Sequence, residues 1–250
     1  MNTILEVDRL VKKYKNGRGV DDISFSVKEG EVIGLLGPNG SGKTTIMKCI
    51  VGLQHYNGGR IRVFGADPAQ NTEEVLKHTG ALIEQPALYE NLTAKRQLKM
   101  MTRYYNSLES MAVENALKDV GLERYGNEKV RRYSLGMKQR LGIAMAMISD
   151  PELVILDEPG NGLDIESTVE LRNRIVKTAK ERGRSFLVSS HQADDLERMC
   201  DRVIIIYEGA LIEDISVDEA LKRSPSLEDY FLMRVRSEKH PGAVKGGVPQ

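Results

Sequence analysis

The sequence predicts an α/β fold whose core is a mainly parallel sheet. Two short, continuous apolar runs are typical of strands buried on both faces, and they lie at Val32 to Leu36 and at Leu153 to Leu156. Helical periodicity extends from Leu92 to about Ile148 between these runs, which indicates a mostly helical insertion. A chain of 250 residues can bury the core of one such domain together with an inserted subdomain.

The segments around the first buried strand are predicted to be mainly β. A strand is expected from Ile4 to Leu10. A half-buried strand follows, because apolar and polar residues alternate through Ile23, Phe25 and Val27. A further strand is expected from Gly59 to Phe64. The N-terminal part of the chain should therefore contribute several strands before the helical insertion begins.

After the insertion, strand and helix patterns alternate again. Helical periodicity is predicted over Ile165 to Lys180, and a strand is predicted from Ser185 to Ser189. Two further strands, Val203 to Tyr207 and Leu211 to Asp214, are joined by the short turn Glu208-Gly209. This arrangement predicts a hairpin at the end of the sheet.

The domain boundaries follow from the same patterns. One folded domain is predicted over residues 1–236, with a helical subdomain inserted at about 86–150. Residues 237–250 are rich in Gly, Pro and Lys and have few apolar side chains, so they are predicted to form a disordered tail. The chain shows no internal repeat, which predicts one such domain per chain.

Composition narrows the location and the partners. Lys plus Arg equals Asp plus Glu at 36 each, so no bulk basic field argues for nucleic acid or anionic lipid, and we expect no nucleic-acid partner. No apolar run is long enough to cross a bilayer, and the N-terminus lacks the apolar core of a signal peptide. We therefore expect a cytoplasmic location. Cys49 and Cys200 fit apolar helical patterns and are interpreted as buried hydrophobes.

A glycine-rich turn after the first buried strand carries the strongest chemical signal. Residues 37–44, Gly-Pro-Asn-Gly-Ser-Gly-Lys-Thr, match the phosphate-loop pattern G-x-x-x-x-G-K-[ST], and a helix is predicted from Thr44 to Val51. Glycines let successive backbone N–H groups face one anion, and the helix N-terminus adds the positive end of its dipole. Lys43 supplies a charge for the β- and γ-phosphates, and Thr44 offers a hydroxyl to Mg²⁺.

An ordinary tight turn between a strand and a helix is the plainer alternative for this segment, but it does not require this combination of residues. The loop is therefore predicted to bind a nucleoside triphosphate. The predicted nucleotide-binding residues are Gly37, Pro38, Asn39, Gly40, Ser41, Gly42, Lys43, Thr44 and Thr45.

Two acids end the strand that begins at Leu153. In phosphate-loop proteins such a strand lies beside the first one, and its terminal Asp, here Asp157, holds Mg²⁺. Glu158 lies one residue further on, where it could orient and deprotonate an attacking water. Two surface acids at a strand end are the plainer alternative. The phosphate loop in the same chain favours the catalytic interpretation.

Three further segments resemble those of one family, the ABC ATPases. Tyr133 to Arg140, Tyr-Ser-Leu-Gly-Met-Lys-Gln-Arg, resembles the ABC signature. Asn161 to Asp164 follows Asp157-Glu158-Pro159 and resembles the D-loop, and Ser189-Ser190-His191 at a strand end resembles the switch histidine. The segments occur in the family's order over about Ile4 to Arg223. The resemblance implies a P-loop NTPase core, an N-terminal antiparallel β subdomain and an inserted helical subdomain.

The resemblance also implies a mechanism in which ATP lies between two subunits. In such head-to-tail dimers, one subunit's phosphate loop faces the other's signature, so a second ATP-binding subunit is expected, either another copy or a close relative. The signature residues facing the opposite ATP would be Ser134, Leu135, Gly136 and Met137.

Other site residues are implied by the same resemblance. The implied catalytic residues are Glu158, His191 and Lys43, with His191 holding the γ-phosphate and Glu158 in line. Tyr14 matches the aromatic residue that stacks on adenine, and Asp164 is the aspartate of the D-loop. Taken alone, His191 would more often be a structural histidine and Tyr14 an amphipathic surface residue.

Several positions depart from the family pattern. In the signature, Leu135 and Met137 stand where Gly and Gln are usual, and Gly160 stands where Thr commonly follows Asp-Glu-Pro. Glu84 occupies the place of the loop glutamine, with Gln85 displaced by one. An anion there could bind Mg²⁺ or its water and would alter how the site senses nucleotide. The predicted metal ligands are Thr44, Asp157 and Glu84.

This combination resembles the ATPases of peptide-antibiotic exporters of the bacitracin-resistance and lantibiotic-immunity type, which carry a Glu in this loop. The resemblance implies an ATP-hydrolysing subunit, peripheral on the inner face of the membrane, that powers export of a peptide antibiotic, lantibiotic or other drug-like compound through a multi-span permease. The loop after Glu84 would form the floor of a groove for the permease's coupling helix. Nearby methionines are interpreted as core filler, namely Met100, Met101, Met145 and Met147.

Three other functions stay open at this point. A soluble ABC ATPase acting on the ribosome or on DNA is disfavoured by the neutral charge and by the lack of a long coiled-coil insert. An importer ATPase would usually keep the loop glutamine that Glu84 replaces. A regulatory module that binds ATP without turnover would not need Glu158 and His191.

Overall fold

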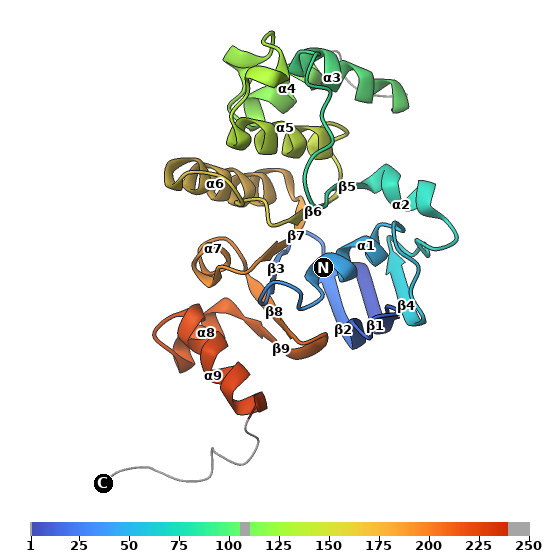
Figure 1. Cartoon of the computed structure of the whole chain (residues 1–250), viewed down its shortest axis with the longest axis vertical. Helices are drawn as coiled ribbons and strands as arrows, with labels where there is room; N and C mark the ends of the chain where they lie inside the picture. The colour runs from blue at the N-terminus through green and yellow to red at the C-terminus, as the bar shows by residue number, and fades with distance from the viewer. Residues whose placement is uncertain (1, 106–110, 240–250) are drawn as a thin grey trace.

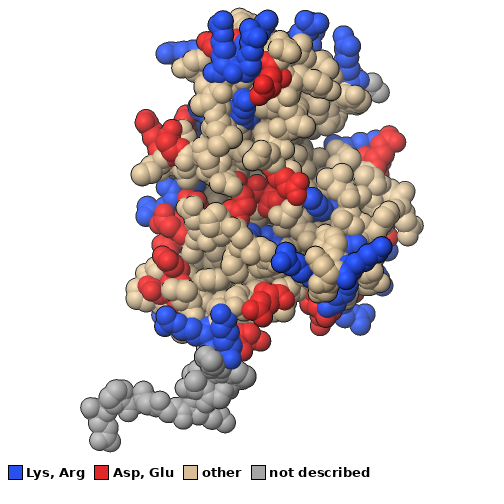
Figure 2. All heavy atoms as spheres, in the orientation of Figure 1, with Lys and Arg blue, Asp and Glu red and all other residues tan. Residues whose placement is uncertain are grey.

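The computed structural model describes residues 2–105 and 111–239. It contains two sheets and an inserted helical part (Figure 1). The helical part lies at one end of the molecule, the larger sheet lies in the middle, and the C-terminal helices lie at the opposite end. Lys and Arg side chains gather along the outer edge of the helical part (Figure 2).

The N-terminal sheet has three antiparallel strands in the order β2-β1-β4. These strands are β1 (Thr3–Lys13), β2 (Gly19–Lys28) and β4 (Gly58–Val63). Val7 of β1 pairs with Phe25 on one side and Ile61 on the other, and all three are buried. Buried and exposed residues alternate in this sheet because only one of its faces packs on the core. The predicted antiparallel β subdomain is confirmed.

The larger sheet has six strands in the order β5-β6-β7-β3-β8-β9, and only the β8–β9 pair is antiparallel. The strands are β3 (Val32–Leu36), β5 (Thr79–Leu82), β6 (Leu153–Asp157), β7 (Ser185–Ser190), β8 (Arg202–Tyr207) and β9 (Ala210–Ser216). Every residue of β3, β6 and β7 is buried, as their apolar runs predict. The carboxyl ends of these three neighbouring strands meet at one edge, so the residues that follow them converge.

Alternate residues of β3 face two different cores. Ile33 faces a cluster shared with the N-terminal sheet and with helix α1 (Lys43–Ile50). Leu36 faces a second cluster that contains Leu171 of α6 (Ile165–Arg182) and Leu196 of α7 (Ala193–Glu197). Strand β3 is therefore packed on both faces, and this packing holds its carboxyl end in place at the edge of the sheet where the site lies.

The helical part connects β5 to β6. Its helices are α3 (Ala94–Met101), η1 (Thr102–Tyr104), α4 (Ala112–Asp119), η2 (Glu123–Tyr125), η3 (Val130–Arg132) and α5 (Leu135–Met147). The apolar faces of α3, α4 and α5 join the second core cluster through Leu98, Leu117 and Leu141. The insertion is therefore packed on the sheet and is not a separate globule.

Two elements before the insertion were not predicted. Helix α2 (Thr72–His78) leads into β5, which has only four residues and no alternating pattern. Pairing with β6 makes this segment a strand. Gly80 in β5 allows α5 to pack closely, because a Cβ at this position would lie 1.9 Å from the carbonyl oxygen of Ala146.

The C-terminal helices correct one predicted boundary. They are α8 (Val217–Arg223) and α9 (Leu227–Lys239), so residues 237–239 are helical and the predicted tail does not begin at 237. Residues 240–250 lie outside the described part. None of the described helices is long and apolar enough to span a bilayer. Cys49 and Cys200 are buried free thiols, as predicted.

Candidate active site

Two glycines without room for a side chain shape the phosphate loop. Gly37 follows β3, and a Cβ there would lie 2.1 Å from the carbonyl oxygen of Ile206. Gly42 has a φ of +113°, and its Cβ would lie 2.3 Å from Val20 Cγ1. Helix α1 begins directly afterwards at Lys43. The loop can thus present backbone N–H groups and a helix N-terminus to one anion.

Lys43 is buried beneath this loop. Its side chain is 5% exposed, and its ammonium donates to the carbonyl oxygens of Gly37 at 2.7 Å and Pro38 at 3.2 Å. The same ammonium lies 3.3 Å from a carboxylate oxygen of Glu158. A buried ammonium needs compensation, and the two carbonyl groups provide it as hydrogen-bond acceptors while Glu158 provides it as an ion-pair partner. A phosphate in the loop would compete with them for Lys43.

Asp157 accepts hydrogen bonds on both of its carboxylate oxygens. The Thr44 hydroxyl donates to Oδ2 at 2.7 Å, and the Ser189 hydroxyl donates to Oδ1 at 2.5 Å. Asp157 ends β6 and is 4% exposed, and Ser189 lies opposite it on β7. The hydroxyls offset the cost of burying this carboxylate. The structure thus brings together Thr44 and Asp157, two of the three predicted metal ligands.

Glu158 lies between the two side chains predicted to act with it. Its Oε2 is 2.7 Å from His191 Nδ1, and its Oε1 is 3.3 Å from Lys43 Nζ. Its backbone has a φ of +48°, which is uncommon for a residue with a side chain. The N–H of Glu158 donates to Ser189 Oγ at 2.9 Å, which helps to hold this conformation. All three predicted catalytic residues therefore converge.

A cleft of about 370 Å³ opens beside the phosphate loop. The Tyr14 ring is 36% exposed at this cleft, and its hydroxyl lies 3.5 Å from Thr45 Oγ1. The Lys12 ammonium lies 5.1 Å from the ring centroid. An exposed aromatic face next to the phosphate loop suits stacking of a flat base. The adenine contact of Tyr14 stays a prediction. The cleft is also lined by Asn16, Arg18, Asn39 and Lys43.

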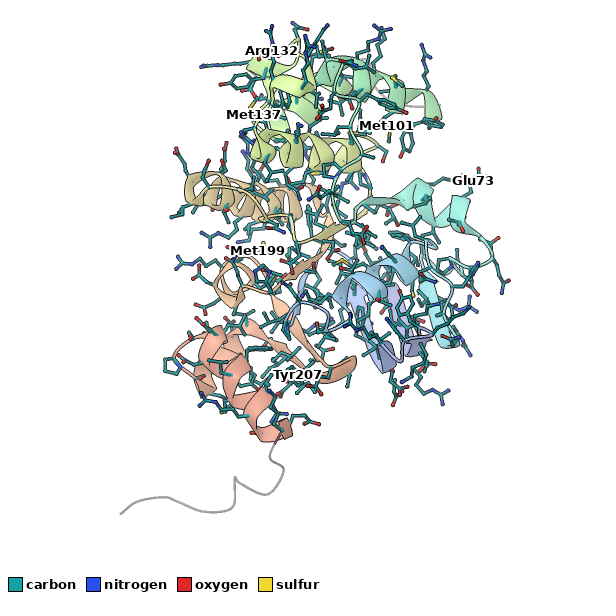
Figure 3. All side chains as sticks on the ribbon, in the orientation of Figure 1. Glu73, Met101, Arg132, Met137, Met199 and Tyr207 are labelled. Carbon is teal, nitrogen blue, oxygen red and sulfur yellow. The ribbon has the colours of Figure 1, made fainter. Side chains whose placement is uncertain are left out.

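The signature residues lie on the helical part. Ser134 caps α5, because its hydroxyl accepts a hydrogen bond from the Met137 N–H at 3.2 Å. The Leu135 side chain is 60% exposed. A Cβ on Gly136 would lie 3.0 Å from Leu163 Cδ2, so the signature packs against the D-loop of its own chain. Figure 3 shows Met137 near one end of α5. None of these four residues contributes to the lining of the cleft beside the phosphate loop.

Asp164 begins the helix that follows the D-loop. Its carboxylate accepts a hydrogen bond from the Ser167 N–H at 2.7 Å, and this bond lowers the pKa of Asp164. Gly160, which replaces the usual Thr, has room for a side chain, since a Cβ there would lie 3.6 Å from the nearest oxygen of Asp195. Within one chain, the D-loop aspartate therefore serves as a helix cap.

Glu84 pairs with a lysine that was not predicted. Its carboxylate lies 2.6 Å from the Lys48 ammonium, and its backbone φ is +62°. Lys48 lies one helical turn after Thr44 on α1. Among the described residues, Lys48 is the sole ion-pair partner of Glu84. The role of Glu84 as a metal ligand stays a prediction, because the structure places its carboxylate on Lys48.

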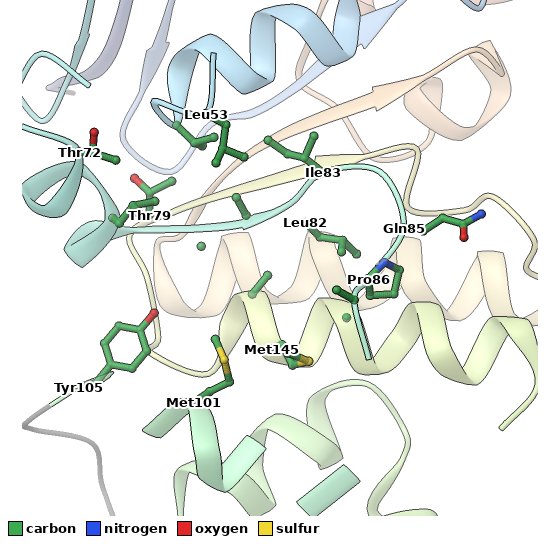
Figure 4. A pocket seen from close by; sticks show the side chains of 17 residues that line it. Leu53, Thr72, Thr79, Leu82, Ile83, Gln85, Pro86, Met101, Tyr105 and Met145 are labelled. Carbon is green, nitrogen blue, oxygen red and sulfur yellow. The ribbon is translucent and has the colours of Figure 1, made fainter. Parts of the chain in front are cut away.

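An apolar groove of about 480 Å³ begins next to Glu84. Gln85 and Pro86 line it together with Leu53 (Figure 4). Met101 and Met145 form the side that belongs to the helical part. These two methionines therefore wall a groove as well as packing on the core, which corrects their interpretation as filler only. Met100 is 37% exposed, whereas Met147 packs on the core as predicted.

The residues of the site fit a nucleotide with a divalent cation. At the site, two buried oxygens have no hydrogen-bond partner among the described residues, namely Ser41 Oγ in the loop and Glu158 Oε1 beside it. The described residues contain no cluster of three or more His, Cys, Asp or Glu side chains that could hold a metal alone. A hard cation at Thr44 and Asp157 would therefore need further oxygen ligands, which phosphates and water supply.

Two residues of the site were missed in the sequence. Ser189 bridges Asp157 and the backbone of Glu158, and Lys48 neutralises Glu84. The position of Ser189 two residues before His191 at a strand end could have indicated the first contact. The spacing of Lys48 four residues after Thr44 placed it on the site's side of α1. Its pairing with Glu84 depends on tertiary structure.

The family model described as "ABC transporter" matches residues 20–161. The bacitracin transport ATP-binding protein BcrA of Bacillus licheniformis is 41% identical over 232 residues, which cover 93% of this chain and 76% of that protein. The lantibiotic transport ATP-binding protein SrtF of Streptococcus pyogenes is 37% identical over 236 residues, covering 94% of this chain and 99% of that protein.

A solved structure has the same architecture. It is described as the structure of an ATP-binding subunit of an ABC transporter, and it superposes with a TM-score of 0.83 at 30% identity. The superposition covers 93% of this chain and 100% of the solved one. The architecture of this chain is thus that of a known protein fold.

Proposed function

The chain belongs to the ABC transporter family as an ATP-binding subunit, and we propose on this premise that it powers an exporter of peptide antibiotics. It is an ATP-hydrolysing enzyme of that family. One observation carries its chemistry: Glu158 lies between Lys43 and His191 at the edge of the phosphate loop. The names of the relatives, bacitracin transport and lantibiotic transport, support the class of cargo.

The hydrolytic step follows from these contacts. The phosphate loop and Lys43 bind the phosphates of ATP, so Lys43 leaves Glu158 for a stronger acceptor. Glu158 then takes a proton from a water molecule as the water oxygen attacks the γ-phosphorus and the bond to ADP breaks. His191, already 2.7 Å from Glu158, holds the carboxylate and the phosphate in line. Thr44 and Asp157 would hold Mg²⁺, which offsets the charge of the phosphates.

The exposed signature supports a working dimer. Ser134 is an exposed helix cap, and Leu135 is 60% exposed, so this surface is available to a second subunit. The N-terminus of α5 would add backbone N–H groups and a hydroxyl to the phosphates bound by that subunit. The second subunit is a copy of this chain or a close relative.

The groove beside Glu84 supports a membrane partner. Its apolar walls and its position between β5 and the helical part suit an amphipathic segment of a multi-span permease. The subunit would then lie peripherally on the inner face of the membrane. Closure of the dimer on ATP and its opening after hydrolysis would move this groove and drive export.

The alternatives weighed from the sequence are not favoured. Neither relative described above is a protein of the ribosome or of DNA repair, and both are named for transport of an antimicrobial peptide. Neither of these two relatives is named as a subunit of an importer. The ATP-binding module without turnover is disfavoured because the general base and its histidine are in contact.

The test is a pull-down of tagged Glu158→Gln protein with ATP from solubilised membranes of its own host. A trapped ATP-bound state should retain a multi-span membrane protein at near-stoichiometric yield. Glu152→Gln is the matched control, because Glu152 is an exposed acid just before the start of the same strand. Recovery of the tagged protein alone, or of ribosomal or DNA-repair proteins, would overturn the exporter proposal while leaving the ATPase intact.

A further inference from the structure

We propose that the helical part carries a binding surface for anionic lipid headgroups, formed by a ridge of basic side chains that make no ion pair with any described residue. The ridge consists of Arg96, Lys99, Arg103, Lys129, Arg131 and Arg132. This inference rests on the proposed function only in placing the chain at a membrane.

The charge of the chain is unevenly distributed although its sum is zero. Residues 86–147 contain 11 Lys and Arg against 6 Asp and Glu, so the remainder contains 25 against 30. The helical part is therefore positive, and the rest of the molecule is negative. In Figure 2 the basic atoms lie along the outer edge of the helical part. Such a charge dipole turns this end toward an anionic surface.

Helix α3 supplies the first half of the ridge. Arg96, Lys99 and Arg103 are spaced three and four residues apart, so they lie on one side of the helix and its short continuation. All three are exposed, whereas Gln97 and Leu98 on the other side are buried. None of the three forms an ion pair with any described residue, in contrast to Lys95, which lies 3.7 Å from Glu114.

The segment before the signature supplies the second half. It lies beside the start of α3, because Thr93 and Lys129 form an isolated bridge and the Val130 N–H donates to the Leu92 carbonyl at 2.9 Å. Lys129, Arg131 and Arg132 are exposed and have no carboxylate partner in the described chain. Figure 3 shows Arg132 at the outer edge of the molecule. The two halves therefore form one continuous row.

The shape of the ridge favours a headgroup layer over a folded partner. Long, exposed side chains in a row suit many weak contacts with a diffuse anionic surface. Tyr104 is 82% exposed next to Arg103, and an exposed Tyr beside basic residues is typical of a membrane interface. The helix also provides Met101 to the apolar groove, so the ridge begins at the rim of the proposed permease site.

A planar surface also suits the charge of the rest of the molecule. A membrane would touch only the positive end, whereas a long nucleic acid would also meet the net-negative remainder. We therefore choose anionic lipid and treat nucleic acid as an outcome that would overturn the proposal.

The test is co-flotation of the purified full chain with vesicles of phosphatidylglycerol and phosphatidylcholine at low salt, compared with phosphatidylcholine alone. The chain should float only with the anionic vesicles, and added salt should release it. The triple variant Arg96→Gln, Lys99→Gln, Arg103→Gln should lose at least tenfold in partitioning, since one basic residue near such a surface typically contributes about fivefold.

A matched control removes the same charge elsewhere. Lys28→Gln, Arg60→Gln, Arg62→Gln changes exposed residues of the N-terminal sheet and should retain partitioning within about twofold. Both triple variants should keep their ATPase activity, which verifies their folding. Equal loss in the two variants, equal flotation with neutral vesicles, or preferential binding of a duplex DNA probe through the ridge would each overturn the proposal. Failure here with successful capture of a permease by Glu158→Gln would leave the exporter proposal standing.

Discussion

The phosphate loop and the signature are both predicted to contact ATP, yet the structure prepares them very differently. Lys43 and Asp157 are 5% and 4% exposed, and each already has partners within the chain. Leu135 of the signature is 60% exposed, and the only side-chain hydrogen bond of Ser134 with a described residue caps its own helix. One region is preorganised by the fold, whereas the other presents exposed groups that we propose to meet ATP on a second subunit.

The topology explains this difference. Neighbouring parallel strands β6, β7 and β3 bring Asp157, His191 and the loop to one edge, so a single chain must assemble this half. The signature begins a helix of the inserted part, which packs on the sheet through its apolar face and leaves the cap exposed. If the site is split in this way, one subunit would bind ATP but hydrolysis would depend on association.

The largest effect is expected at the preorganised half. Glu158→Gln should lower ATP turnover about a thousandfold, because the amide cannot accept the proton of water. ATP should still bind and should still bring two subunits together, since Lys43 and the loop are unchanged. Phosphate release and light scattering measure the two properties. Hydrolysis at the parental rate would show that Glu158 is not the base.

A smaller but more selective effect is expected at the signature. Ser134→Asp keeps a good helix cap, whereas Ser134→Ala removes it at a cost of about 1 kcal/mol in stability. If Ser134 faces a phosphate of the second subunit, the added charge of Asp should reduce ATP-induced dimerisation more than Ala does, by about tenfold or more.

Nucleotide affinity of the monomer should not change in either Ser134 variant, because Ser134 does not line the cleft beside the phosphate loop. Fluorescent-nucleotide titration and thermal melting separate these contributions. If Ser134→Asp dimerises as well as the parent and better than Ser134→Ala, then dimerisation follows stability. Ser134 would in that case be only a helix cap.

The difference between the two regions also explains which parts of the site could be predicted from the sequence. The preorganised half depends on continuous apolar strands and on residues adjacent to their ends, and both are local patterns, so Lys43, Asp157 and Glu158 were found together. Strand β5 was missed because its four residues have no period of their own and form a strand by pairing with β6. The prediction placed the start of the tail at residue 237 because of the composition of residues 237–250, whereas α9 continues to Lys239.

The distribution of charge on the surface also could not be predicted from the composition of the sequence. The sum of zero excluded a bulk basic field but concealed the basic ridge, since the sum carries no information about position. The departure at Glu84 was visible in the sequence, but its lysine partner lies 36 residues away and became evident only when α1 and β5 were in place.

The smallest effect is expected at the Glu84–Lys48 pair, which links α1 to the loop that follows β5. The pair is 2.6 Å long, but the Glu84 side chain is 64% exposed, so its coupling energy should be only about 0.5 kcal/mol. Its position is the reason for testing it, because Glu84 lies between the phosphate site and the groove. Glu84→Gln and Lys48→Gln should each retain ATP binding and change turnover a few-fold.

If the pair acts as a unit, the effect of the double variant on turnover, expressed as a free energy, should differ from the sum of the two single effects. Lys77→Gln with Glu74→Gln, an exposed pair of similar length on α2, provides the matched cycle without contact to the site. The response of turnover to reconstituted permease gives the decisive readout. If neither the basal rate nor this response changes in Glu84→Gln, then Glu84 is incidental, and the groove communicates with the phosphate loop by another route.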